Sequence, residues 1–230
     1  MRSGATQDVV ALPARERLIA AAELMLAVAF VLGANVLDIV PVSETPWLVL
    51  IGWLSLRLRG LGWRSVGLTR PASWARTLAF ALLAAVLLQL ASEFVVEPLI
   101  ERWTGETPDL SSFRPLTGNL PATLGMLAAA WVLAAFGEEL VYRGYVLERA
   151  ATLGHRTPAA WILAMIVISV LFGLGHVYQG VAGVASSTFA GLYFGSLYLA
   201  TGRNLWLPIL AHGFSDTIAL ALIYLGLVEI

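Results

Sequence analysis

Three ionisable residues, Glu138, Glu139 and Arg143, lie within six positions of an otherwise apolar segment that begins near Leu120. If this segment spans a bilayer, each charge costs a few kcal/mol at the centre of the helix. A chain that keeps such groups in an apolar segment uses them in one of two ways. They face a protein-lined cavity and take part in chemistry there, or they form an internal salt bridge that positions another group.

The spacing of these residues on a helix indicates separate roles. Glu139 and Arg143 are four residues apart, share a helix face and can neutralise one another. Glu138 lies on a different face, together with Tyr142, and is the better candidate for a general base. Glu139 is expected to orient or support other groups. The alternative is a buried salt bridge with one additional glutamate at the end of a helix.

Two later histidines extend the set of candidate residues. His176 closes the pattern Phe172-x-x-x-His176, and His212 precedes Asp216 by four residues. A single histidine in an apolar helix is most often a hydrogen-bonded structural residue, but two of them on separate helices, one with an aspartate partner, favour a site. His155 lies beside an arginine in a polar loop and is expected to be solvated.

Carboxylates and imidazoles around a hydrated cavity are typical of hydrolysis. A glutamate takes a proton from water, the water attacks a carbonyl, and hydrogen-bond donors stabilise the oxyanion. The residues expected to meet in this cavity are Glu138, His176, His212 and Asp216. The sequence contains no His-Glu-x-x-His pattern, no phosphate-binding loop and no convincing Ser-His-Asp set.

Composition indicates the class of protein that must position these residues. Of 230 residues, 59% are hydrophobic and only 13% are charged, whereas about a quarter of the residues of a soluble domain are charged. We expect a single integral membrane domain over residues 1–230, an all-α polytopic bundle. The net charge of −1 gives no indication of nucleic-acid binding. The absence of cysteine excludes disulfides, thiolate zinc sites and thiol nucleophiles.

Apolar runs predict about seven transmembrane spans, within a range of six to eight. They are expected over residues 18–40, 47–58, 77–99, 120–151, 158–176, 181–200 and 205–228. Five arginines between residues 57 and 76 predict a cytoplasmic loop, and the polar N-terminus, 1–17, is expected on the same side. Gly191 and Gly195 are expected to allow close helix packing inside the bundle. With a helical rise of about 1.5 Å per residue, one shared cavity requires that the helices tilt or unwind.

Three motifs together resemble a known family of intramembrane proteases. It is the CAAX-protease and bacteriocin-processing (CPBP) family, which includes the Ras-converting enzymes and the bacterial Abi proteins. The resemblance covers residues 120–222. The motifs are Glu138-Glu139-x-x-x-Arg143, Phe172-x-x-x-His176 and His212-x-x-x-Asp216.

The resemblance implies an all-helical membrane peptidase in which Glu138 and His176 activate water while His212 and Asp216 line an oxyanion hole. It also implies Zn²⁺ as a candidate cofactor, because the family is often described as metal-dependent. His176, His212 and Asp216 are the candidate ligands. A metal-free glutamate mechanism fits the residues equally well, and we slightly favour it. An ionised Asp216 donates no hydrogen bond, so it would be protonated, orient His212 or bind the metal.

The expected partners are membrane lipid and a peptide or protein substrate, with no nucleic acid. The substrate is a prenylated CAAX-like peptide, a leader peptide, a retained signal or a membrane-bound regulator. The expected location is the cell membrane, the inner one in a bacterium, with several spans. An alternative is a non-catalytic immunity or scaffold protein that binds a peptide or a partner helix. A small transporter with buried acid pairs is a third reading, which predicts inverted repeats and broken helices.

Overall fold

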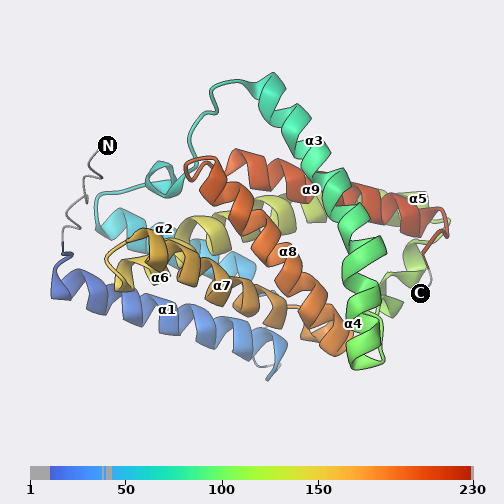
Figure 1. Cartoon of the computed structure of the whole chain (residues 1–230), viewed down its shortest axis with the longest axis horizontal. Helices are drawn as coiled ribbons and strands as arrows, with labels where there is room; N and C mark the ends of the chain where they lie inside the picture. Colours follow the sequence, from blue (N-terminus) through green and yellow to red (C-terminus); the bar gives the residue numbers. More distant parts are fainter. Residues whose placement is uncertain (1–10, 38, 40–42, 229–230) are drawn as a thin grey trace, which may run out of the picture.

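The computed structural model of the chain describes residues 11–37, 39 and 43–228. These residues form helices and their connections, and none of them is in a strand. Parts of two predicted segments lie outside the described residues. They are residues 1–10 of the expected polar N-terminus and residues 38 and 40 of the first expected span. Within them, the expectation of an all-helical fold is confirmed (Figure 1).

The helices keep the chain order of the apolar runs, although their bounds differ. The α-helices are α1 (Ala14–Asn35), α2 (Thr45–Leu58), α3 (Trp74–Ala91), α4 (Glu97–Thr104), α5 (Leu120–Ala129), α6 (Leu147–Leu153), α7 (Pro158–Leu174), α8 (Gly180–Ala200) and α9 (Trp206–Tyr224). Two π-helical segments, η2 (Ser92–Val96) and η4 (Ala130–Val146), continue α3 into α4 and α5 into α6. Short 3₁₀ turns are η1 (Trp63–Val66), η3 (Ser111–Leu116) and η5 (Val177–Gln179).

Local sequence sets several helix starts. Asn119 accepts a hydrogen bond at Oδ1 from the backbone N–H of Ala122, and Thr157 accepts one at Oγ1 from the N–H of Ala160. These side chains satisfy backbone donors that the first helical turn leaves unpaired. Proline follows each cap within two residues, where its missing N–H costs nothing. Helix α5, which leads into the Glu138–Arg143 stretch, and helix α7, which follows α6, therefore begin where the caps place them.

The number of membrane spans differs from the expected count of about seven, which is not confirmed. In the described part of the chain, four continuous helices are long and apolar enough to cross a membrane. They cover Ala14–Asn35, Trp74–Thr104, Leu120–Leu153 and Trp206–Tyr224. The α7–α8 pair is bent by 61° and adds at most one broken span. Helix α2, with 14 residues, reaches only about 21 Å, whereas the hydrocarbon core is about 30 Å thick.

The segment η4 lies in the middle of the structure, where α2 and α9 pack against it. The long helix formed by α3, η2 and α4 runs across α9, and α8 packs along α7 (Figure 1). Gly191 allows the second of these contacts, because a Cβ atom there would lie 3.0 Å from the Cβ of Ser169. A Cβ at Gly195 would meet Met165 at 2.8 Å. Both glycines therefore serve packing inside the bundle, as predicted.

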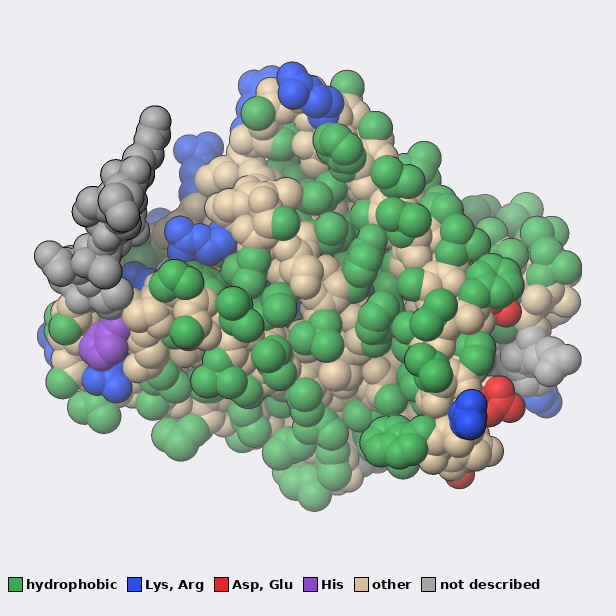
Figure 2. All heavy atoms as spheres, in the orientation of Figure 1, with side chains coloured by type: hydrophobic (Ala, Val, Ile, Leu, Met, Phe, Trp, Pro, Cys, Tyr) green, Lys and Arg blue, Asp and Glu red, His purple; other side chains and the backbone are tan. Residues whose placement is uncertain are grey.

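The surface in Figure 2 is largely covered by hydrophobic side chains. Many large apolar residues of α3 are exposed, among them Leu82, Leu83 and Leu87. Basic side chains gather near the start of α3, and acidic ones lie near α4 (Figure 2). An apolar surface between two charged ends is what a bilayer requires of a spanning protein.

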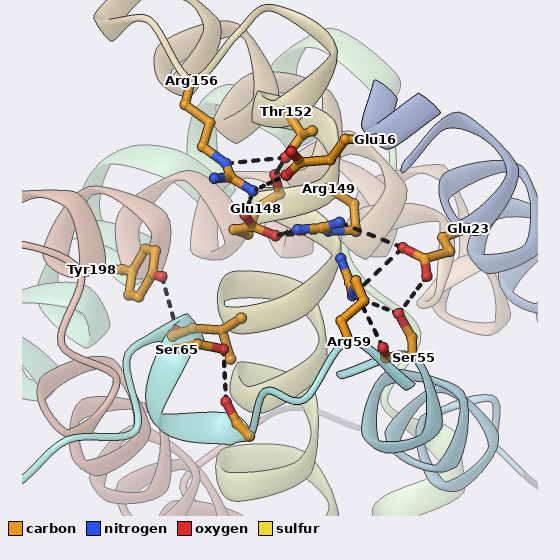
Figure 3. Close-up of polar contacts among 12 residues, drawn as sticks. Glu16, Glu23, Ser55, Arg59, Ser65, Glu148, Arg149, Thr152, Arg156 and Tyr198 are labelled. Atoms are coloured by element: carbon orange, nitrogen blue, oxygen red, sulfur yellow. Dashed lines mark hydrogen bonds and ion pairs between the residues drawn. The ribbon is translucent and has the colours of Figure 1, made fainter. Parts of the chain in front are cut away.

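A polar network outside the central helix crossing ties α6 to α1 and α2 (Figure 3). Arg149 donates to Glu148 and lies 3.7 Å from Glu23 Oε2, and Glu23 accepts a hydrogen bond from Ser55. Arg59 donates to Ser55 Oγ at 2.6 Å. Because these charges pair with one another, they can remain at helix interfaces without an isolated buried charge.

Candidate active site

The stretch with the two glutamates lies in the π-helical segment η4, where an α-helix was expected. The backbone N–H of Leu147 bonds to the carbonyl of Tyr142, five residues back, as a π-helix requires. π-Helical segments are rare in proteins, but those that occur are often found at functional sites. The predicted ion pair between Glu139 and Arg143 is present in this π-helical segment, since Arg143 Nη1 lies 2.8 Å from Glu139 Oε1.

Glu139 is the centre of the buried polar contacts. Its side chain is fully buried, and Oε1 accepts from Arg143 Nη1 at 2.8 Å and lies 2.9 Å from His212 Nδ1. Glu139 Oε2 has no hydrogen-bond partner among the described residues. Asp216 Oδ1 lies 3.6 Å from Nε2 of the same histidine. One oxygen of Glu139 therefore contacts both Arg143 and His212.

Arg143 is held by aromatic rings and by a backbone carbonyl. Its guanidinium carbon lies 4.4 Å from the ring centroid of Phe172 and 5.5 Å from that of Phe194. Nη2 donates to the carbonyl of Gly191 at 3.3 Å. The ring of Phe194 also stacks on His212, with centroids 4.7 Å apart. These contacts connect η4, α7, α8 and α9 at one buried point.

His176 lies in the break between α7 and η5, where the helix pair bends by 61°. Its Nδ1 is 3.0 Å from the carbonyl oxygen of Phe172. A carbonyl only accepts, so Nδ1 carries the proton and Nε2 is left as an acceptor in the neutral ring. The expected unwinding thus occurs at the end of α7, and it brings His176 to the cavity.

A cavity of about 980 Å³ joins the predicted residues. Glu138, His176, His212 and Asp216 all line it. No described residue donates a hydrogen bond to the carboxylate of Glu138. Among the described residues the lining contains no Lys or Arg, and its carboxylates are Glu44, Glu93, Glu97, Glu101, Glu138 and Asp216. The described lining is therefore rich in carboxylates, and that of Glu138 faces the cavity without a donor from the described residues.

Sequence reasoning missed Glu44, which lies between the first two apolar runs, 18–40 and 47–58. Glu44 is buried, with 5% of its surface exposed, and lines the same cavity. Its Oε1 accepts from the Tyr142 hydroxyl at 2.6 Å, and its Oε2 accepts from Asn35 Nδ2 at 2.9 Å. The sequence offers one weak signal, because Glu44 is the only acidic residue between Asp38 and Glu93. His155, which was expected to be solvated, is half-buried, and its Nδ1 accepts from the backbone N–H of Leu12 at 2.9 Å.

The candidate zinc ligands do not form a metal-binding group in this structure. Over residues 11–37, 39 and 43–228, no set of three or more His, Cys, Asp or Glu side chains is placed to hold a metal ion. His176, His212 and Asp216 line the cavity, but they do not converge as a ligand set.

Long apolar helices around a cavity lined by carboxylates and imidazoles define an all-helical integral membrane protein with a site suited to hydrolysis. Residues 120–218 match the family model described as type II CAAX prenyl endopeptidase, Rce1-like. This match assigns the segment to the CPBP family of CAAX proteases, confirms the resemblance and implies a peptidase. Neither the curated proteins nor the solved structures contain a match to the chain.

Proposed function

We propose that this protein is an intramembrane endopeptidase in which Glu138 activates water to hydrolyse a peptide bond of a membrane-associated substrate. One observation carries the proposal. Glu138, His176, His212 and Asp216 line one cavity, and all four lie within the segment that matches the peptidase family. A general base needs a free carboxylate within reach of water, and Glu138 has no hydrogen-bond donor among the described residues.

The histidines are suited to different steps of this reaction. His176 keeps Nε2 available because Nδ1 bonds to the Phe172 carbonyl, so it can accept a hydrogen bond from the attacking water. His212 Nδ1 lies 2.9 Å from Glu139 Oε1, whereas Nε2 lies 3.6 Å from Asp216 Oδ1, which is too far for a hydrogen bond. An Nε2–H would therefore be available to donate to the oxyanion of the tetrahedral intermediate. In this arrangement Asp216 orients His212 and does not itself donate to the oxyanion.

The substrate is a peptide that reaches the cavity from the membrane. The family is named for prenylated CAAX peptides, and a leader peptide of similar apolar character is the other substrate class. The cavity of about 980 Å³ lies in the upper part of the volume range that small-molecule sites occupy, which leaves room for an extended peptide segment.

The test is cleavage of quenched fluorescent peptides by the full-length protein purified in detergent. Two reporters are compared, one with a farnesylated C-terminal CAAX sequence and one with an unprenylated leader-like sequence. The variants are Glu138→Gln and, as the matched control, Glu23→Gln. Glu23 is a largely buried carboxylate that belongs to the network in Figure 3 and not to the cavity lining. Each protein is assayed with and without a zinc chelator.

We expect wild type and Glu23→Gln to cleave and Glu138→Gln to lose at least about 100-fold in kcat, the lower bound for a general base. The faster reporter identifies the substrate class. Cleavage that persists with chelator supports the metal-free glutamate mechanism, whereas loss restored by Zn²⁺ returns His176, His212 and Asp216 to the role of ligands. Full activity of Glu138→Gln would refute the proposal, and no cleavage by wild type would favour the non-catalytic binding protein.

A further inference from the structure

Glu44 and Tyr142 join the N-terminal helices to the segment that carries Glu138. Glu44 immediately precedes α2, whereas Tyr142 lies in η4, four residues after Glu138. The Tyr142 hydroxyl donates to Glu44 Oε1 at 2.6 Å, and Asn35 at the end of α1 donates to Oε2 at 2.9 Å. All four side chains line the cavity. Each oxygen of Glu44 therefore has a donor, and one of these donors comes from the proposed catalytic segment.

The Glu44–Tyr142 pair also lies against the turn that carries His176. A Cβ atom at Gly175 would lie 3.3 Å from Glu44 Oε1 and 3.6 Å from the Tyr142 hydroxyl oxygen. The ring of Tyr142 packs edge-on against Phe172, whose carbonyl fixes His176. Glu44 is thus in contact with both elements that bring the proposed water-activating residues to the cavity.

The direction of one proton gives this arrangement a chemical consequence. A phenolic hydroxyl carries a single proton and rotates toward whichever acceptor suits it. Glu138 and Tyr142 lie four residues apart in η4, and both side chains line the cavity. With Glu44 present, the proton points to Glu44 Oε1. Without it, the hydroxyl can donate to Glu138, and a carboxylate that accepts such a bond is a weaker base toward water.

We infer that Glu44 is a positioning residue for the hydrolysis: it holds the Tyr142 proton away from Glu138, so that the Glu138 carboxylate stays free to deprotonate water. The inference rests on the proposed function and adds to it a residue from outside the segment 120–218 that matches the family. Glu44 does not touch the reacting atoms in this role. It acts through Tyr142.

The test is steady-state kinetics of the full chain on the reporter that wild type cleaves. Glu44→Leu removes the acceptor, and Glu44→Gln has a similar size but keeps a carbonyl oxygen for the Tyr142 proton. Asn35 keeps a second acceptor, the carbonyl of Val31 at 3.0 Å, so neither variant leaves its amide without one. Each variant is also made with Tyr142→Phe. The matched controls are Glu23→Gln and Tyr198→Phe, since Tyr198 is a buried tyrosine that donates to the Val66 carbonyl (Figure 3), and neither residue belongs to the cavity lining.

We expect Glu44→Leu to lower kcat about 10- to 100-fold with KM within about threefold, because a misdirected hydrogen bond removes part of the general-base contribution. Glu44→Gln should retain most of kcat. Adding Tyr142→Phe to Glu44→Leu should raise kcat again by about tenfold, because no hydroxyl remains to occupy Glu138. The controls should change kcat by less than about threefold. A purely structural role predicts the opposite for the double variant, since a second lost contact would lower activity further.

A double variant as slow as Glu44→Leu, or slower, would overturn the inference. Cleavage by wild type with unchanged kcat in Glu44→Leu would overturn it alone, whereas no cleavage by wild type would overturn the proposed function and this inference with it. If Glu44→Leu fails to fold by gel filtration and circular dichroism, Glu44→Ala takes its place with the same expectations for both backgrounds.

Discussion

Replacing Arg143 by methionine is expected to be among the most destabilising single changes in the site. The substitution removes the guanidinium that lies 2.8 Å from Glu139 Oε1, and Glu139 is fully buried with Oε2 already lacking a partner. Removing one partner of a buried ion pair costs about 3–5 kcal/mol, because the other charge is left uncompensated. The contact of Arg143 with the Phe172 ring at 4.4 Å adds about 0.5–2 kcal/mol.

The double variant Glu139→Gln/Arg143→Met should be much less destabilised than the sum of the two single variants. Each single variant leaves one buried charge without its partner, whereas the double variant removes both charges, so no uncompensated charge remains. We expect a coupling free energy of about 2 kcal/mol, within the range for residues in direct contact. The matched control is Arg203→Met, because Arg203 lies 4.8 Å from the Trp161 ring but is exposed. Its loss should cost less than about 1 kcal/mol.

The assay is reversible unfolding in mixed micelles, followed by circular dichroism and by the fluorescence of the eight tryptophans. Midpoints and slopes are compared for wild type, both single variants, the double variant and the control. Strictly additive free energies for the double variant would refute the reasoning, because they would mean that Glu139 and Arg143 do not stabilise one another. An Arg143→Met variant no less stable than Arg203→Met would refute it as well.

Three further outcomes follow from the same contacts. Reporter peptides with Lys or Arg near the cleaved bond should have a lower KM than matched acidic peptides, because the described cavity is lined by six carboxylates and by no Lys or Arg; kinetics at low and high salt should show the difference shrinking as ions screen it. Gly191→Ala should destabilise by about 1–3 kcal/mol, because its Cβ would lie 3.0 Å from that of Ser169; unfolding midpoints check this against Gly125→Ala, which meets nothing within 4 Å and should gain slightly as a helix interior residue. Asp216→Asn should keep cleavage within about tenfold if Asp216 only orients His212 through the 3.6 Å contact, and a loss as large as that of Glu138→Gln in the reporter assay would contradict this.

The contacts that sequence could predict are local ones. The Glu139–Arg143 pair and the His212–Asp216 pair each join residues four apart, and both are present at 2.8 Å and 3.6 Å. Spacing on one helix is enough to predict such contacts. The motifs that suggested a protease also combine short patterns, and the segment that holds them is the one that matches the family.

The count of about seven spans is not confirmed, because hydropathy measures composition and not the path of the chain. The apolar runs at 158–176 and 181–200 look like two spans, but α7 and α8 are halves of a helix pair bent by 61° at His176. The bend falls at residues 175–179, where a turn leads into the 3₁₀ segment η5, with Gly175 at one end and Gly180 at the other. His176 lies at this bend and lines the cavity, so the feature that leaves the span count open also places one residue of the candidate site.

Glu44 shows where a sequence-based reading of the site stops. Its partner Tyr142 is 98 positions away, and no local pattern links a carboxylate before one helix to a tyrosine inside another. The family resemblance gives no help either, because the match begins at residue 120. Glu138, His176, His212 and Asp216 all come from the matched segment, but the wall that faces them includes Asn35 and Glu44 from the N-terminal helices. If the matched segment supplies the chemistry, Glu44, which precedes α2, determines through Tyr142 whether the Glu138 carboxylate is free to accept a proton from water.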